Sequence, residues 1–308
     1  MTRPYRRWRS FAQVDVFTEV PYLGNPVAVV LDGDGIADDE MAGLAKWTNL
    51  SETTFIVPPA SDEADYGLRI FTPGGEIPFA GHPTLGSAHA WLEAGGTPKA
   101  PGVLTQECGL GLVRVRRHDN GLSFRAPARR RSGPLEDAHV DRIARGLRID
   151  RARITGHQWV DNGPGWAGVQ LASAAEVLAL EPDEQHMRDL TLGVVGAHPE
   201  GAPEQFEVRA FALPQGVRED PVTGSLTAGL AQWLVGDGRA PRAFRVGQGA
   251  ALGRKGVLTV ETQGEDIWVG GASVTCVRGT LQTLERRISA RVSGRDGSVT
   301  GRLRSVQA

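Results

Sequence analysis

Cysteine is scarce in this chain, which has two, Cys108 and Cys276, among 308 residues. Two cysteines so far apart provide neither the spacing of a zinc site nor a disulfide framework. No apolar run approaches the roughly 18 residues of a membrane span. The basic segment that opens the chain, MTRPYRRWRSF, lacks the apolar stretch of a secretory signal. We therefore expect a cytoplasmic protein with no metal site and no membrane partner.

The chain also lacks an excess of charge of one sign, because its formal net charge is −2. Proteins dedicated to nucleic acids carry a basic excess. We therefore expect no nucleic-acid partner, and we interpret Arg129-Arg130-Arg131 as a basic cluster on a solvated face. The sequence has no Gly-x-Ser-x-Gly elbow, no Gly-x-Gly-x-x-Gly that opens a helix and no Walker loop. These absences argue against a serine hydrolase and against a nucleotide-binding site.

What the chain does contain is one phrase written twice. The first copy is LRIFTPGGEIPFAGHPTLGSAHAWL, from Leu68 to Leu92, and the second is VRAFALPQGVREDPVTGSLTAGLAQWL, from Val208 to Leu234. Each copy has an Arg-x-Phe strand, a Gly/Pro-rich turn, a polar residue before proline, and a Gly-Ser pair that opens an alanine-rich helix. The copies lie about one domain length apart. We therefore predict two similar halves that face each other across a cleft.

Hydrophobic periodicity predicts strands and helices on both sides of a Pro/Arg-rich segment, 126–134. We predict an N-terminal half over 1–128, completed by a strand near 274–284, and a C-terminal half over 129–273. A tail over 285–308 has few large apolar residues, so we expect it to be loosely ordered. The predicted helices cover 38–46, 83–92, 136–147, 173–180 and 182–189, and the predicted strands cover 11–17, 25–31, 53–57, 66–71, 109–117, 121–125, 158–162, 168–171, 244–246, 257–261, 267–269 and 273–276, with a strand, turn and helix over 206–234.

Two loops of the repeated phrase place a polar residue before proline, His82-Pro83 and Asp220-Pro221. This order is typical of a helix N-cap followed by proline at the first helical position. The N–H groups of such a helix end can bind a carboxylate, or stabilise the negative charge that develops when a proton leaves its α-carbon. Ordinary capping would explain one such loop. Two equivalent loops at a shared cleft instead indicate a site for an anion.

Glu52 is the one acidic residue in the segment Asn49 to Phe55, between a predicted helix and an apolar strand. Burial would raise the pKa of a carboxylate there, which suits general acid–base chemistry near neutral pH. The sequence also allows purely structural roles for the same residues. Glu52 would then be an exposed strand start, and His82 and Asp220 would be helix caps. In a functional role, His82 holds a substrate group or moves a proton, and Asp220 binds a substrate amine or hydroxyl.

Together these segments resemble the PhzF-like family of phenazine biosynthesis proteins. The resemblance covers roughly residues 10–284 and rests on six motifs in order: FTEVPYLGNPVAVV, NLSETTF, RIFTPGGEIPFAGHPTLGSAHA, EDPVTGS, QGAALGRKGVLTV and VGGASV. It implies the α+β fold of diaminopimelate epimerase, in which two pseudo-symmetric halves each wrap a mixed β-sheet around a central helix. It also implies a homodimer.

The resemblance implies isomerisation without a cofactor. In the best-known members, a glutamate of the Ser-Glu-Thr motif moves a proton between ring carbons of trans-2,3-dihydro-3-hydroxyanthranilate, a small carboxylate-bearing metabolite. Here that general acid–base is Glu52. The positions that would bind the substrate are Gly81, His82, Asp220, Gly224 and Ser225.

Two other functions are possible for such a cleft. A binding protein would keep the carboxylate site and perform no chemistry. A racemase of the related epimerase type would need one cysteine in each half, but the two loops read GHPT and DPVTGS, so we do not expect it. One departure from the family pattern is the loop Asn162-Gly163-Pro164-Gly165, which lies between Trp159 and Trp166. If it faces the cleft, this loop changes the shape of the pocket.

Overall fold

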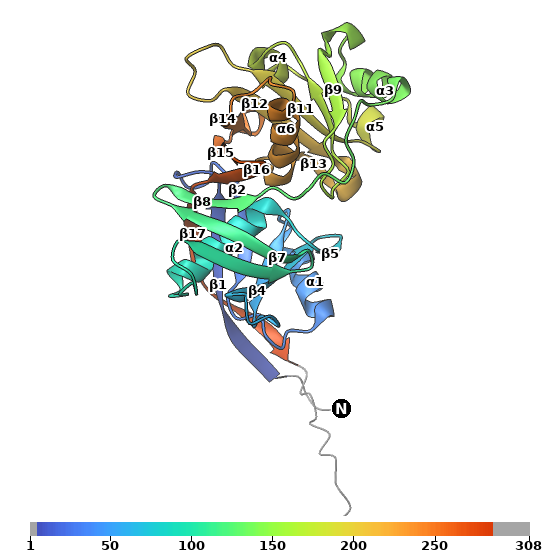
Figure 1. The fold of residues 1–308 in the computed structure, drawn as a ribbon. Coiled ribbons are helices and arrows are strands. Elements are labelled where there is room, and N and C mark those ends of the chain that lie inside the picture. The colour runs from blue at the N-terminus through green and yellow to red at the C-terminus, as the bar shows by residue number, and fades with distance from the viewer. Residues whose placement is uncertain (1–4, 286–308) are drawn as a thin grey trace, which may run out of the picture.

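The computed structural model describes residues 5–285 and shows the chain as two lobes stacked end to end (Figure 1). Of the predicted tail, 285–308, only Glu285 lies within the described residues. The lobe at the bottom of Figure 1 contains both ends of the described chain. The lobe at the top contains the middle of the chain, and the two lobes meet along neighbouring strands.

The bottom lobe consists of the N-terminal strands, two helices and the last described strand. Its strands are β1 (Tyr5–Val16), β2 (Asn25–Val30), β3 (Thr53–Val57), β4 (Tyr66–Thr72), β5 (Gly75–Ile77), β6 (Val103–Cys108), β7 (Gly111–His118), β8 (Gly121–Arg125) and β17 (Ser273–Glu285), and its helices are α1 (Asp38–Thr48) and α2 (Gly81–Glu93). Strands β1 and β17 pair antiparallel along their whole length. The predicted strands over 109–117 and 121–125 correspond to β7 and β8, which pair antiparallel on either side of a two-residue turn.

The top lobe has the remaining strands and four helices. Its strands are β9 (Gly156–Trp159), β10 (Ala167–Gln170), β11 (Thr191–Ala197), β12 (Phe206–Ala212), β13 (Val217–Asp220), β14 (Ala243–Gln248), β15 (Gly256–Gln263) and β16 (Asp266–Gly271), its helices are α3 (Asp137–Leu147), α4 (Ala174–Leu178), α5 (Glu184–Met187) and α6 (Gly224–Gly236), and 3-10 turns cover Arg151–Arg153, Leu213–Gln215 and Ala250–Leu252.

Strand pairing connects the two lobes, because β16 of the top lobe pairs antiparallel with β8 of the bottom lobe. Through this pair, all seventeen described strands belong to one connected network. The network is mixed, as the sequence predicts. Its parallel pairs are β2–β3, β4–β6, β10–β11 and β12–β14, and the other pairs are antiparallel.

Two helices of 13 residues, α2 and α6, lie against these sheets and have nine buried residues each. Helix α2 packs on β1, β2 and β8, and α6 packs on β15 and β16. Both helices are rich in glycine, alanine and leucine, which allow close packing on a sheet. The prediction that a Gly-Ser pair opens each helix holds for Gly224-Ser225. It is wrong for Gly86-Ser87, which lies buried in the middle of α2.

The duplicated Arg-x-Phe motif has the same contacts in both copies. Arg69 on β4 donates two hydrogen bonds to Glu76, at 2.8 and 2.6 Å. Arg209 on β12 donates two to Glu219, both at 2.8 Å. Each guanidinium also lies over the ring of the phenylalanine two residues later, 5.2 and 5.1 Å from its centre. Each pair thus ties its strand to the turn that leads into the buried helix.

The predicted helix caps are wrong at both loops. The N-cap of α2 is Ala80, so His82 and Pro83 lie inside the first turn. Proline is tolerated there because the first N–H groups of a helix have no intrahelical partner. The N-cap of α6 is Thr223, while Asp220 ends β13 three residues earlier. Both residues are therefore free of a capping role.

Four strands, β5, β6, β11 and β13, are absent from the sequence prediction. Strand β11 reads TLGVVGA, and glycine is unfavourable in strand interiors. The structure requires Gly193 because a Cβ at this position would come 2.3 Å from a methyl carbon of Leu226 on α6. Strand β6 pairs with β4 and β7, and these long-range contacts determine its conformation.

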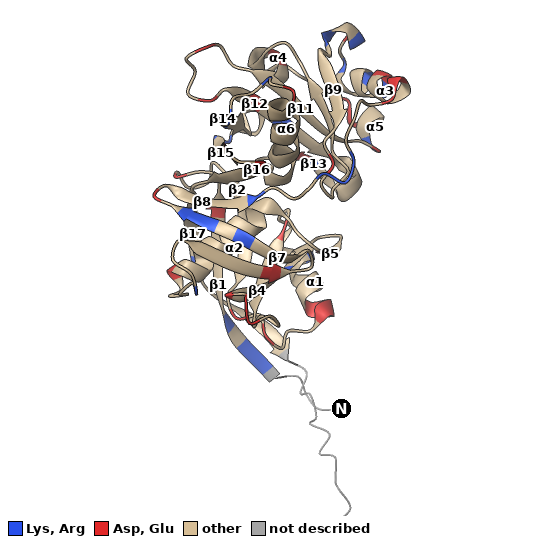
Figure 2. Ribbon diagram, viewed as in Figure 1, with Lys and Arg blue, Asp and Glu red and all other residues tan. Residues whose placement is uncertain are grey.

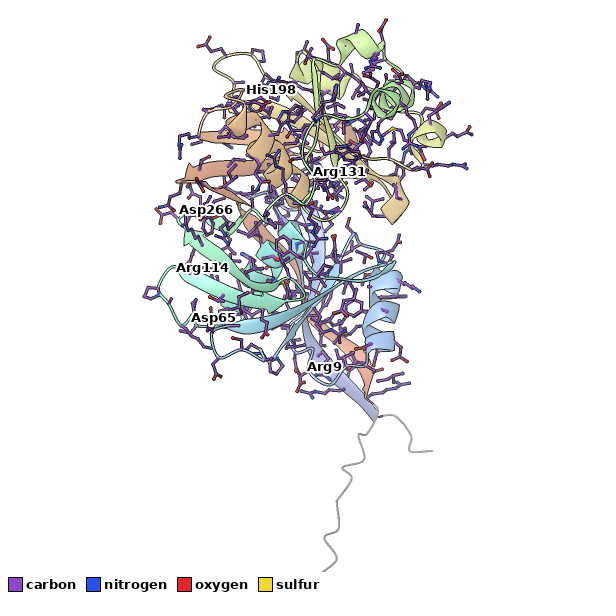
Figure 3. The ribbon with its side chains drawn as sticks, turned by 45° about the vertical axis from the view of Figure 1, so that its right-hand side comes forward. Arg9, Asp65, Arg114, Arg131, His198 and Asp266 are labelled. Carbon is purple, nitrogen blue, oxygen red and sulfur yellow. The ribbon has the colours of Figure 1, made fainter. Side chains whose placement is uncertain are left out.

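Charged residues are spread over both lobes (Figure 2). Figure 3 places Arg9 low on β1 and Arg131 in the top lobe. The Arg9 side chain is fully buried and donates hydrogen bonds to Thr283 and Asp32. Within residues 5–285, no helix combines the length and the apolar character that a membrane crossing requires.

Candidate active site

A pocket of about 580 Å³ lies where the loops before α2 and α6 come together. Three segments that are far apart in the sequence meet there: the turn before β3, the start of α2, and the chain from β13 into α6. All residues that the sequence predicts for the site line this pocket, namely Glu52, Gly81, His82, Asp220, Gly224 and Ser225.

The N-termini of α2 and α6 touch inside this pocket. A Cβ added to Gly81 would lie 3.5 Å from the carbonyl carbon of Gly224 and 2.6 Å from the ring of Phe124, so only glycine allows this approach. Neither N-cap residue, Ala80 or Thr223, accepts a hydrogen bond through its side chain from its own helix. The first-turn N–H groups and the positive ends of both helix dipoles are therefore available to an anion.

Glu52 lies between the end of α1 and the start of β3, and its side chain is only 14% exposed. The backbone on both sides of it is held in place. The hydroxyls of Thr48 and Thr53 are 2.8 Å apart, and Thr54 contacts Ser87 on α2 at 2.8 Å. Burial, and secondarily the negative charge of Asp220, raises the pKa of Glu52 from its ordinary 4.5 to about 8.

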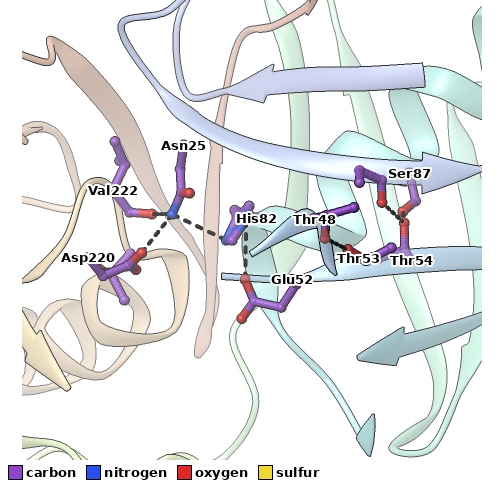
Figure 4. Close-up of polar contacts among 11 residues, drawn as sticks. Asn25, Thr48, Glu52, Thr53, Thr54, His82, Ser87, Asp220 and Val222 are labelled. Carbon is purple, nitrogen blue, oxygen red and sulfur yellow. Dashed lines mark hydrogen bonds and ion pairs between the residues drawn. The ribbon is translucent and has the colours of Figure 1, made fainter. Parts of the chain in front are cut away.

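His82 faces Glu52, with Nε2 3.3 Å from Oε2, yet neither atom has a hydrogen-bond partner of good geometry (Figure 4). Burial lowers the pKa of His82 to about 3, although a hydrogen bond with the Pro26 carbonyl opposes the shift. These opposite shifts keep a proton on Glu52 at neutral pH and leave the His82 ring neutral. When the proton of the neutral ring lies on Nδ1, the Nε2 lone pair faces Glu52.

Asn25 holds the two halves of the site together (Figure 4). Its Nδ2 donates to Asp220 Oδ1 and to the Val222 carbonyl, both at 2.9 Å, and lies 3.4 Å from Nδ1 of His82. An amide nitrogen has two hydrogens, so Asp220 and Val222 use both. Nδ1 of His82 accepts a third, longer hydrogen bond from Asn25 only when the imidazole proton lies on Nε2.

Asp220 is fixed by a second set of hydrogen bonds. Thr223 donates to its Oδ2 at 2.6 Å, and Gln248 donates to its backbone carbonyl at 2.9 Å. Burial raises the pKa of Asp220 to about 6, against the hydrogen bonds from Thr223, Asn25 and Ser51, which favour the charged form. Both carboxylate oxygens therefore already have donors.

Replacing Asn25 by leucine should lower the free energy of unfolding by about 2–4 kcal/mol, because two buried acceptors lose their donor. Asn25 is 1% exposed, so water cannot replace the lost hydrogen bonds. Denaturant unfolding measures this loss. The double variant Asn25→Leu/Asp220→Asn should be less destabilised than the sum of the single variants. Strictly additive losses would contradict a direct link between the two residues.

Several residues of the site escaped prediction from the sequence. Asn25, Thr223 and Gln248 act through contacts over long sequence separations, and only the motif GNPVAVV gave a signal for Asn25. The basic cluster is not simply solvated, because Arg130 lines the pocket and Arg129 donates to Gln158 at 2.6 Å. The sequence left open whether the loop after Trp159 faces the cleft. In the structure it does, since residues 162, 163, 164 and 166 line the pocket.

Neither cysteine lines this pocket, which agrees with the expectation that a two-cysteine racemase is not built here. Cys108 lies at the end of β6 and contacts the Gly111 carbonyl, and Cys276 lies on β17. Over the described range, 5–285, no group of three or more histidine, cysteine, aspartate or glutamate side chains is arranged as metal ligands. We therefore assign no residue to a metal.

This chain is similar to known proteins over most of its length. A family model described as "Phenazine biosynthesis-like protein" matches residues 14–279. "Antisense-enhancing sequence 1" of Schizosaccharomyces pombe is 36% identical over 291 residues, which cover 88% of this chain and 97% of that protein. The trans-2,3-dihydro-3-hydroxyanthranilate isomerase of Pseudomonas aeruginosa is 32% identical over 275 residues, covering 86% of this chain and 94% of the isomerase.

The fold is also that of solved structures. The crystal structure of a PhzF-family phenazine biosynthesis protein from Bacillus anthracis superposes with a TM-score of 0.76 at 21% identity and covers 89% of this chain and 99% of that chain. The family model covers most of the sequence, and both relatives exceed 30% identity over nearly their full length. This chain therefore belongs to the phenazine biosynthesis-like (PhzF) family.

Proposed function

We propose that the protein is a cofactor-independent isomerase that moves a proton between carbon atoms of a small carboxylate-bearing metabolite, with Glu52 as general acid–base. The observation that carries this proposal is a buried carboxyl group with a pKa of about 8 in the same pocket as two uncapped helix N-termini. Such a pKa lies near neutral pH, where a group both accepts and returns a proton efficiently.

In this mechanism the substrate carboxylate binds at the N-termini of α2 and α6. The ionised form of Glu52 removes a proton, so the substrate C–H bond breaks and an O–H bond forms on Glu52. The electron pair delocalises toward the substrate carboxylate, where helix N–H groups stabilise the negative charge. Glu52 then returns the proton to another carbon, which forms the new C–H bond and restores the ionised carboxylate.

His82 and Asp220 assist without exchanging protons with the substrate. Neutral His82 accepts a hydrogen bond from the protonated Glu52, which orients the carboxyl group 3.3 Å away. The charge of Asp220 raises the proton affinity of Glu52 and so keeps its pKa near neutrality. The Ser225 hydroxyl accepts a hydrogen bond from Trp166 at 3.1 Å, which aligns the first turn of α6.

We further infer that the two halves are pseudo-symmetric, each a mixed sheet around one helix, α2 or α6. The paired Arg–Glu contacts in the two copies of the repeat support this relation. So does the meeting of two helices of equal length at their N-termini. A pair of equivalent helices doubles the positive potential at the carboxylate.

Proton exchange in deuterated water tests the proposal. A panel of small unsaturated and cyclic carboxylic acids, which includes trans-2,3-dihydro-3-hydroxyanthranilate because relatives act on it, is incubated with the protein and followed by NMR. We expect carbon-bound deuterium or a new isomer with at least one member. Isomer formation is scored separately, because a fully internal transfer leaves no deuterium. Ligand-induced thermal stabilisation without exchange or isomer formation would support a binding protein instead.

A further inference from the structure

The pocket holds a buried hydrogen-bond acceptor that proton transfer does not use, Oδ1 of Asn162. Asn162 is 8% exposed, lines the pocket, and donates through Nδ2 to the backbone carbonyl of Ser225 at 2.8 Å. A carbonyl oxygen only accepts hydrogen bonds, so the nitrogen of the carboxamide must face it. The oxygen is thereby left without a partner. Buried polar atoms nearly always have one.

The loop that carries Asn162 is rigidly docked on the first turn of α6. The side chain of Asp161 accepts hydrogen bonds from the N–H groups of Gly163 and Gly165, both at 2.7 Å. Trp166, which is 3% exposed, donates to Oγ of Ser225 at 3.1 Å. These contacts hold the carboxamide of Asn162 in one orientation without a ligand, and such preorganisation favours binding.

The two carboxyl groups of Asp220 and Glu52 already have roles in the proposed function. Asp220 has a donor on each carboxylate oxygen, from Asn25 and Thr223. Glu52 faces His82 and carries the transferred proton. Asn162 is thus an acceptor with free capacity, and its carboxamide adjoins Ser225 at the end of α6 where the carboxylate binds.

We propose that Asn162 is a specificity-determining residue whose Oδ1 accepts a hydrogen bond from an amino or hydroxyl group that the substrate carries beside its carboxylate. This inference rests on the proposed function, because it takes the end of α6 as the carboxylate site. The substrate class is then a carboxylic acid with an N–H or O–H donor close to the acid group. Acids with a methyl group at that position leave Oδ1 buried and unsatisfied, so they bind more weakly.

Three matched acids test this assignment on the full-length protein: mandelate with a hydroxyl, 2-phenylglycine with an amino group, and 2-phenylpropionate with a methyl group on the α-carbon. Both enantiomers of each are titrated calorimetrically. We expect the wild type to bind an enantiomer of a donor-bearing acid about five- to tenfold more tightly than 2-phenylpropionate. Comparison of mandelate with 2-phenylglycine shows whether a hydroxyl or an amino donor is preferred.

Variants separate the acceptor from general effects on the pocket. Asn162→Leu should abolish the preference, whereas Asn162→Asp, which keeps an acceptor oxygen, should retain it even if all affinities fall. Gln215→Leu removes another, exposed, amide that lines the pocket and donates to the Pro164 carbonyl, so it should leave the preference unchanged. A wild type without a preference, or a preference that survives Asn162→Leu, would overturn the assignment.

Binding of these acids requires no proton transfer, so the two proposals fail separately. Loss of the preference with Glu52-dependent exchange intact would remove only the role of Asn162. A preserved preference in a protein that exchanges no proton would support the role of Asn162 and remove the isomerase mechanism.

Discussion

Replacing Glu52 by glutamine should slow carbon-bound proton exchange by about 10²–10⁴-fold while the binding of a carboxylate is retained. Glutamine has nearly the same shape as glutamate but neither accepts nor returns a proton at neutral pH. The helix ends at Gly81 and Gly224 are unchanged by the substitution, so the anion site persists. Exchange rates by NMR and dissociation constants by calorimetry, measured on both proteins, separate the two effects.

Stability provides the control for this variant. Burial raises the pKa of Glu52 from 4.5 to about 8, so its contribution to stability is full below pH 4.5 and is lost as the pH rises through 8. At about 1.4 kcal/mol per pKa unit, the loss is on the order of 5 kcal/mol. The Glu52→Gln variant does not undergo this loss. It should therefore melt at a higher temperature than the wild type at pH 9, and the two melting temperatures should be more similar at pH 5. Full exchange activity in this more stable variant would refute the role of Glu52.

The second large effect is on the pH dependence of the reaction. If the ionised form of Glu52 starts the reaction, kcat/KM should fall about tenfold per pH unit below its pKa of about 8. The useful window is pH 6.5 to 8.5, above the range in which Asp220, whose pKa is about 6, takes up its own proton. Rates at a fixed low substrate concentration, measured across this window, give the profile.

Asp220→Asn is the matched variant for this profile. The charge of Asp220 raises the pKa of Glu52, although less than burial does, so its removal should move the acidic limb to lower pH. For each protein, the rates on the acidic limb are expressed relative to that protein's own plateau at high pH, so that only the position of the limb is compared. A rate that instead falls as the pH rises through 8 would mean that protonated Glu52 acts first, as an acid.

Most of the site was readable from local sequence because its parts are contiguous motifs. The duplicated phrase located both helix ends, and the lone acid among NLSETTF located Glu52. Local rules failed where tertiary packing decided the geometry. His82 and Asp220 looked like helix caps, yet the helices begin at Gly81 and Gly224, because two buried helices must approach each other at residues without side chains.

Asn25 and Asn162 show why the rest of the site could not be predicted from the sequence. Each is a common residue type in a loop or strand start, and the segments GNPVAVV and NGPG that contain them do not indicate which atoms they contact. Asn25 matters because its Nδ2 reaches Asp220, a residue 195 positions later, and Asn162 because its carboxamide reaches Ser225, 63 positions later. Hydrogen bonds over such separations depend on how distant segments of the chain pack together in the folded protein.

By itself the sequence determined which chemical groups are present, in which order and in which motifs, because these properties depend on neighbouring residues alone. Only the tertiary structure decided that Glu52 carries a proton near neutral pH while His82 does not. Both shifts arise mainly from desolvation, which depends on the segments that exclude water from the pocket, and those segments meet only when the chain is folded.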